Sequence, residues 1–334
     1  MNLKHILRPA PHLERHPAQH ALLVLLGAAL ALGATLGVVW AAGFDAVLDR
    51  LQHAHPAWLG LVCGAELIAY GGYAIAYREL VRVEGGPELG LRRAGAIVAA
   101  GFGVFVIRGG FIVDRHALES AGVPPREARV RVLGLGALEY AVLAPVACAA
   151  ALVLLARGAT HPSLGFTLPW AIAVPLGFVG AFAALPFRER VSAHGFFRSA
   201  LRHALDALHI LRRLAVERRR AFAGAALYWS ADVTSLWAAL RMFGERPPLA
   251  GLVIGYATGY ALTRRTLPLG GAGSVEALVS FALAWTGIKL APALLAVFAY
   301  RVFNLWLPLL PAALGLRTLK QLRRAAERTG AGSG

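Results

Sequence analysis

The stretch from Leu262 to Ala277, LTRRTLPLGGAGSVEA, places charges and helix-breaking residues inside an apolar region. Apolar sequence precedes it in GLVIGYATGYA and follows it in LVSFALAWTG. A proline and three glycines allow the chain to unwind here, so we expect a new helix to begin near Ser274. The pattern predicts a hairpin that enters a membrane and returns to the same side.

The composition supports a membrane location for the rest of the chain. Of 334 residues, 57% are hydrophobic and 16% are charged, and the mean hydropathy is +0.59. Soluble domains have about 25% charged residues. We therefore predict an all-α, polytopic membrane helix bundle. The first apolar run, from His20 to Ala42, is too long for a signal-peptide core and is interpreted as a retained anchor. Full-length apolar segments predict crossings at about 20–42, 57–77, 132–156, 166–187, 221–243 and 291–316.

Two further apolar regions, 94–125 and 249–288, are interrupted by glycine, proline and charge, and we interpret both as re-entrant hairpins. Basic residues concentrate in the 1–19 tail, the loops at 78–93 and 188–220, and the 317–334 tail. The positive-inside rule places these segments, including both termini, in the cytoplasm. Region 188–220 has nine arginines and three acids, and is expected to form an amphipathic helix at the membrane surface.

With these loops fixed, the two hairpins enter from opposite sides of the membrane. This predicts an inverted repeat within a transmembrane domain at 20–316, with halves at about 57–187 and 221–316. Inverted repeats with broken helices are a transporter arrangement, in which the substrate site lies between the repeats. A short amphipathic segment at 44–55, FDAVLDRLQHAH, is expected to lie at the outer surface.

The net charge of +16 does not indicate a nucleic-acid partner, because no aromatic and basic platform accompanies it. It is better explained by topology and by anionic lipid headgroups. Cys63 and Cys148 lie in apolar runs, and the histidines lie in tails, loops or segment edges without the spacing of a metal site. No P-loop, dinucleotide fingerprint or catalytic constellation is present. The sequence thus indicates no metal and no cofactor, and favours a transporter over an enzyme.

Charged residues inside a bilayer usually face a cavity or a partner, and this chain has ten of them. They are Glu66, Arg108, Asp114, Arg115, Glu139, Asp232, Arg264, Arg265, Glu276 and Arg301. The arginines favour an anionic guest such as a lipid phosphate. We expect the phosphate to be bound by Arg108, Arg264, Arg265 and Arg301, together with the helix terminus at Gly270, Gly271 and Gly273.

The acids Glu66, Asp114, Glu139, Asp232 and Glu276 would balance these arginines or bind a headgroup amine. Structural alternatives remain for each feature. The glycines could serve helix packing, the charges could form structural ion pairs, and Arg115 with Glu119 has the i,i+4 spacing of a surface pair.

The C-terminal region resembles the lysylphosphatidylglycerol synthase transmembrane-region family, also called the flippase-like domain. The family pattern is a proline, a GGxGxxE turn, an apolar helix, and a Tyr-Arg followed by Trp and Pro. The residues that match it are Pro268, Gly270, Gly271, Gly273, Glu276, Tyr300, Arg301, Trp306 and Pro308. Leu269 stands where the family often has proline, and the VIRGGFIVDRHALE hairpin is less polar than usual.

The resemblance implies a protein of the inner (plasma) membrane that moves an anionic or headgroup-modified phospholipid, or a polyprenyl-phosphate lipid, between leaflets. No soluble aminoacyl-transferase domain follows, so a separate synthetase or glycosyltransferase could act as a partner. Two alternatives stay open. One is a membrane-embedded transferase acting on a polyprenyl-phosphate sugar or a lipid headgroup, and the other is a non-catalytic partner of a cell-envelope enzyme.

Overall fold

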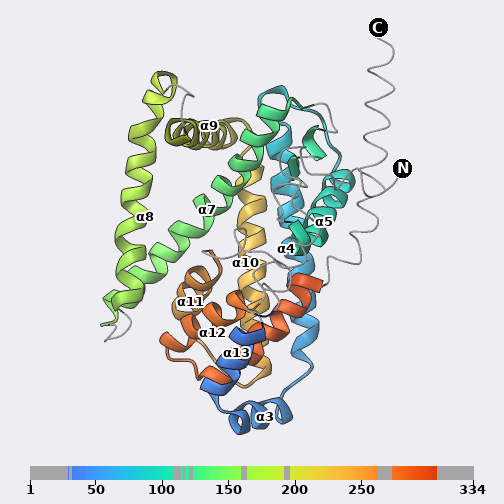
Figure 1. Cartoon of the computed structure of the whole chain (residues 1–334), viewed down its shortest axis with the longest axis vertical. Coiled ribbons are helices and arrows are strands. Elements are labelled where there is room, and N and C mark those ends of the chain that lie inside the picture. Colours follow the sequence, from blue (N-terminus) through green and yellow to red (C-terminus); the bar gives the residue numbers. More distant parts are fainter. Residues whose placement is uncertain are drawn as a thin grey trace.

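The computed structural model describes residues 29, 32–108, 114–115, 117–119, 123–158, 164–191, 196–261 and 273–306. At 100–108, 196, 260–261 and 305–306 it describes the backbone alone. Within these ranges all regular secondary structure is helical, which confirms the predicted all-α class (Figure 1). Most of the predicted first crossing, 20–42, lies outside the described residues.

The centre of the bundle is an antiparallel helix pair, α4 (Trp58–Val81) and α10 (Arg220–Met242). Glycines bring the two backbones together, because a Cβ on Gly72 would lie 2.6 Å from the Tyr228 amide nitrogen. A Cβ on Gly224 would lie 2.7 Å from the backbone nitrogen of Ala76. Small residues permit such close approach in membranes, where helices gain little from hydrophobic association. This pair carries the residues that form the site.

Two long apolar helices cover one side of the pair. Helix α7 (Pro125–Ala156) crosses the bundle obliquely, and α8 (Leu164–Ala184) stands outside it, followed by the 3₁₀ turn η3 (Leu185–Arg190) (Figure 1). The 32 residues of α7 extend about 48 Å at 1.5 Å per residue. In its most apolar 18-residue window, α8 has no buried residue, as expected for a helix that faces lipid.

Three described helices, α4, α7 and α8 with its extension, are long and apolar enough to cross a membrane. A fourth is formed if Leu32–Ala42 and α3 (Phe44–Gln52), which meet at 87°, make one span. The sequence predicted six crossings. Helix α10 is long enough, but Asp232 and its hydroxyl residues lower its apolar content because it faces the bundle interior. Of the predicted 291–316 segment, residues up to 306 form one continuous helical stretch, α13 followed by η5, and 307–316 lie outside the described residues.

The 249–288 region folds as an antiparallel pair, α11 (Leu249–Ala261) and α12 (Ser274–Trp285). A Cβ on Gly255 or Gly259 would lie within 2.8 Å of Leu283 or Val279, so these glycines set the close packing. At 13 and 12 residues, the helices extend about 20 and 18 Å, less than the hydrocarbon core of about 30 Å. Re-entry into a membrane and the inverted repeat remain predictions.

Helix α13 (Leu290–Arg301) follows and passes into a π-helical turn, η5 (Val302–Trp306). The first predicted hairpin begins with α5 (Leu91–Arg108), which packs on α4. In Figure 1, α5 lies toward the end of the bundle that carries α9 (Phe196–Glu217), whereas α11, α12 and α13 lie toward the end with α3.

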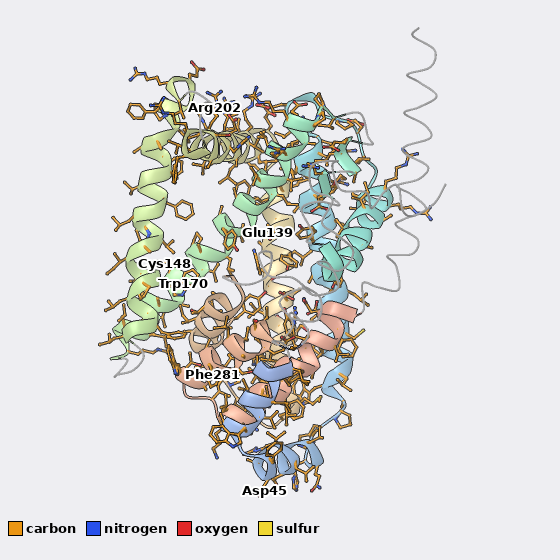
Figure 2. All side chains as sticks on the ribbon, viewed as in Figure 1. Asp45, Glu139, Cys148, Trp170, Arg202 and Phe281 are labelled. Carbon is orange, nitrogen blue, oxygen red and sulfur yellow. The ribbon has the colours of Figure 1, made fainter. Side chains whose placement is uncertain are left out.

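Basic segments that are far apart in the sequence meet at the α9 end. Helix α9 lies across this end, as expected for an amphipathic surface helix (Figure 1). Arg188 Nε lies 2.7 Å from Asp206 Oδ1, and Arg213 Nε lies 3.3 Å from Glu84 Oε1. Arg202 lies at this end and Asp45 at the opposite end (Figure 2). The loops that the sequence assigned to the cytoplasm therefore share one end of the molecule.

Candidate functional site

A buried polar cluster joins α4, α10, α11 and the α13–η5 segment. Its centre is the acid pair, which consists of Glu66 on α4 and Asp232 on α10. Asn304 Nδ2 donates to both carboxyl groups, at 3.2 Å to Glu66 Oε2 and 3.0 Å to Asp232 Oδ1. Tyr300 Oη donates to Asp232 Oδ1 at 2.9 Å, and Tyr256 Oη donates to Asp232 Oδ2. Four separate helical elements thus contribute to one hydrogen-bond network.

The acid pair is removed from solvent, with Glu66 1% exposed and Asp232 fully buried. Ser235, one turn after Asp232 on α10, donates to the carbonyl oxygen of Val62, one turn before Glu66 on α4. This bond aligns the two helices beside the pair. A buried carboxylate is costly unless donors or a cation compensate it. The tyrosines and Asn304 supply that compensation mainly to Asp232.

A buried ion pair lies beside the cluster. Arg301 Nε is 2.9 Å from Glu276 Oε1, and the two side chains are only 5% and 6% exposed. Glu276 is in the first turn of α12, which begins at Ser274 as predicted, and Gly273 before it has φ 78°. That left-handed conformation favours glycine. Arg301 also acts electrostatically on Asp232, so it connects the ion pair to the acid pair.

The structure brings together four of the predicted site residues: Glu66, Asp232, Glu276 and Arg301. Of the other two predicted acids, Asp114 lies away from the cluster, and Glu139 lies next to Trp229, whose ring packs edge-on against Tyr256 with centroids 5.9 Å apart. Asp114 is buried and interacts electrostatically with Tyr77 of α4. Tyr77 is 11 residues from Glu66, or about 16 Å along the helix. Glu139 is buried on α7, and its carbonyl oxygen accepts a hydrogen bond from Trp229 Nε1 at 2.9 Å (Figure 2).

Most of the remaining predicted phosphate ligands belong to the segment that joins α11 to α12. Arg264, Arg265, Gly270 and Gly271 lie outside the described residues, and Arg108 ends α5 with only its backbone described. Arg115 Nε lies 3.2 Å from Glu119 Oε1 in a partly exposed i,i+4 pair, as the surface alternative predicted. In the described part of the chain, no group of three metal-ligating side chains is present.

An open apolar groove of about 870 Å³ lies between α8 and the bundle, lined also by α7, α9, α11 and α12. Its aromatic residues include Phe166, which packs edge-on against Trp285 with ring centroids 4.4 Å apart. Trp170 Nε1 of α8 donates to Thr258 Oγ1 of α11 at 2.9 Å, which ties the outer helix to the bundle (Figure 2). Arg212 of α9 lines the groove at the basic end.

Helix α11 separates this groove from the polar cluster. Tyr256 contacts Asp232, whereas Thr258 lines the groove and bonds Trp170. Positions two apart on a helix point in nearly opposite directions, so both contacts follow from the helical repeat. The apolar and the polar compartments are therefore one helix apart.

Sequence reasoning missed Asn304, Tyr256 and Thr258, and treated Tyr300 only as part of a family pattern. One signal was available: Tyr300 and Asn304 have i,i+4 spacing in an otherwise apolar segment, which places both on one face of a helix. Tyr256 had no comparable signal, because GLVIGYATGYA holds two tyrosines and their facing depends on tertiary packing.

Comparison with known proteins agrees with the motif in the C-terminal half. The family model described as the lysylphosphatidylglycerol synthase TM region matches residues 24–312. Neither a curated protein nor a solved structure matches this chain. The matched region includes the central α4–α10 pair, the groove helices and the whole polar cluster. The chain therefore belongs to the lysylphosphatidylglycerol synthase TM-region family.

Proposed function

We propose that the protein is a lipid transporter of flippase or scramblase type, which moves a lipid with an anionic or modified headgroup between leaflets. The observation that supports this function best is the position of α11, with an open apolar groove on one side and a buried polar cluster on the other. Acyl chains and a charged headgroup require these two different environments.

The groove suits acyl chains. Its lining is almost wholly apolar and aromatic, and one side is formed by α8, whose other face exposes apolar side chains. Arg212 lies at the end where the basic loops gather, and its guanidinium would attract a phosphate group entering from that leaflet. We place the first contact of an anionic headgroup at Arg212.

Arg301 would hold the headgroup deeper in the membrane. Glu276 balances the charge of Arg301. A lipid phosphate therefore has to displace the Glu276 carboxylate, or bind the guanidinium alongside it. Glu276 Oε2 has no hydrogen-bond partner among the described residues, and it could accept a bond from a headgroup amine. The predicted ligands Arg264 and Arg265 belong to the segment that joins α11 to α12, and we propose that they complete this site.

Reconstitution into phosphatidylcholine vesicles tests the proposal. Trace fluorescent phosphatidylglycerol, phosphatidylethanolamine or a polyprenyl phosphate would be added, and leaflet exchange followed by chemical quenching of the outer leaflet. We expect faster exchange than in protein-free vesicles for at least one anionic lipid. Exchange equal to protein-free vesicles for every lipid would refute the transport function.

Matched variants test the route. Arg212→Gln should slow exchange of anionic lipids, whereas Arg213→Gln should not, because Arg213 pairs with Glu84 and Glu217 outside the groove. Ala173→Trp would fill the groove, and Val179→Trp, on a 66% exposed position outside its lining, is the control for bulk on α8. Equal effects of the two tryptophans would exclude the groove as the route.

A further inference from the structure

The acid pair has a charge imbalance that lipid binding does not explain. The carboxyl groups of Glu66 and Asp232 accept hydrogen bonds from one nitrogen, Asn304 Nδ2, at 3.2 and 3.0 Å, so the two acids are neighbours in a buried site. Two ionised carboxylates are both acceptors and cannot hydrogen bond to one another. Two such charges in contact in a dry site repel strongly, so one proton must be shared between them.

The donors around the pair are unequally divided. Asp232 accepts bonds from Tyr256, Tyr300 and Asn304. Glu66 accepts one from Asn304 at 3.2 Å, and its Oε1 has no donor among the described residues although the side chain is 1% exposed. The donors around Asp232 thus suit a carboxylate anion. The surroundings of Glu66 suit a protonated carboxyl group that donates its own O–H.

The charged and titratable groups on the surrounding helices do not remove the imbalance. Arg301 of α13 attracts Asp232 electrostatically, but its Nε forms an ion pair with Glu276 of α12. In the described part of the cluster, three carboxyl groups therefore face one guanidinium. On α7, Glu139 lies beside Trp229, and α5 packs on α4 with side chains described only before residue 100. The described polar groups closest to the pair include Ser235, Tyr256, Tyr300, Arg301 and Asn304. Tyr70 Oη of α4 donates to the carbonyl oxygen of Asn304 at 2.7 Å.

We propose that Glu66 and Asp232 form a proton-binding site that takes up one proton from water onto Glu66, whose O–H then donates a hydrogen bond to the Asp232 carboxylate. Loss of this proton leaves a second carboxylate near Arg301, which attracts the guanidinium and repels a lipid phosphate. Proton uptake would thereby remove one negative charge beside Arg301 and favour binding of a lipid phosphate there. This coupling step rests on the proposed transport function, whereas proton binding does not.

Infrared spectroscopy of the purified full-length protein tests proton binding without any lipid assay. Difference spectra across a pH titration should show the carbonyl stretch of one buried carboxylic acid, which shifts in heavy water. The band should disappear in Glu66→Gln and persist in Glu79→Gln, a buried acid that is paired with Arg78 outside the cluster. Labelling wild-type protein with carboxyl-¹³C glutamate should shift the band, so the assignment holds even if Glu66→Gln fails to fold.

Absence of a carboxylic-acid band at every pH would overturn the proton site. So would a band that glutamate labelling leaves unmoved. Replacing choline chloride by sodium chloride provides a further check: a sodium-dependent rise in melting temperature that Glu66→Gln abolishes would identify a metal-cation site in place of a proton site.

Vesicles with an imposed pH gradient test the coupling. Where protonation limits exchange, the rate should change about tenfold per pH unit, because occupancy by one proton follows pH with unit slope. Glu66→Gln should remove this dependence. Wild-type exchange that is active but independent of pH would overturn the coupling alone, whereas inactivity at every pH would count against the transport function and leave the infrared result standing.

Discussion

Replacing Arg301 by methionine separates the structural and the functional roles of the buried ion pair. With 2.9 Å between Arg301 Nε and Glu276 Oε1, the attraction is about 6 kcal/mol at an effective dielectric constant of about 20. Desolvation of both groups offsets most of this energy. Arg301→Met leaves the buried carboxylate of Glu276 without its partner, which costs about 3–5 kcal/mol.

The reciprocal change should cost less. In Glu276→Leu, the guanidinium of Arg301 keeps its electrostatic interaction with Asp232, so we expect a loss below that of Arg301→Met. The double variant Arg301→Met/Glu276→Leu removes both charges and should recover most of the stability, because apolar replacement of a whole buried pair is often neutral.

Thermal unfolding in detergent, followed by the loss of the monodisperse peak in size-exclusion chromatography, measures these differences. A loss of 3–5 kcal/mol corresponds to a fall of roughly 5–15 °C in melting temperature. A change below about 2 °C for Arg301→Met, in a protein that keeps its fold, would show that the pair is not buried and paired as described. A double variant that folds well but no longer exchanges lipid would assign the pair to transport.

Three further substitutions test the fold that holds the site. Gly72→Val should prevent assembly of the bundle, because its Cβ would lie 2.6 Å from the backbone of α10. The control Gly71→Val should be tolerated, because no atom lies within 4 Å of its Cβ. The yield of monodisperse protein distinguishes the two variants. Gly273→Ala forces alanine to φ 78° and should cost about 1–3 kcal/mol in thermal unfolding. Trp170→Phe removes the bond to Thr258 and should cost about 0.5–1.5 kcal/mol while leaving α8 helical by circular dichroism.

Local signals in the sequence predicted the helices well. Apolar runs located α4, α7, α8 and α10 within a few residues at most ends, although α7 begins seven residues before the predicted 132. The run from Pro125 to Arg131 is charged, so hydropathy excluded it, but Pro125 at the first helical position and Glu127 in the first turn favour a helix start there. Arg131 then donates to the carbonyl oxygen of Val81 at the end of α4. Hydropathy predicts the part of a helix that lies in the hydrocarbon core, and a helix can extend beyond that core at either end.

The site was predicted less completely, for a physical reason. Isolated charges in apolar segments are visible in the sequence, and four of them, Glu66, Asp232, Glu276 and Arg301, do meet. Uncharged donors are not visible in this way, since Tyr256 and Tyr300 resemble ordinary interface aromatics. Asp114 failed to join the cluster because it packs near Tyr77, and the separation of these sites along α4 is set by tertiary packing.

The end of α13 explains how the acid pair and the ion pair could respond to one another. Tyr300 and Asn304 reach the acid pair, while Arg301, about 100° further around the helix than Tyr300, reaches Glu276 on α12. Residues 302–306 form a π-helical turn, and such turns often occur at functional sites because their hydrogen bonds shift register readily. A rotation of this turn would move Asn304 relative to the acid pair and Arg301 relative to Glu276 together. Protonation of the acid pair and headgroup binding at Arg301 would then favour the same position of one helix end, which is the physical requirement for coupling two sites.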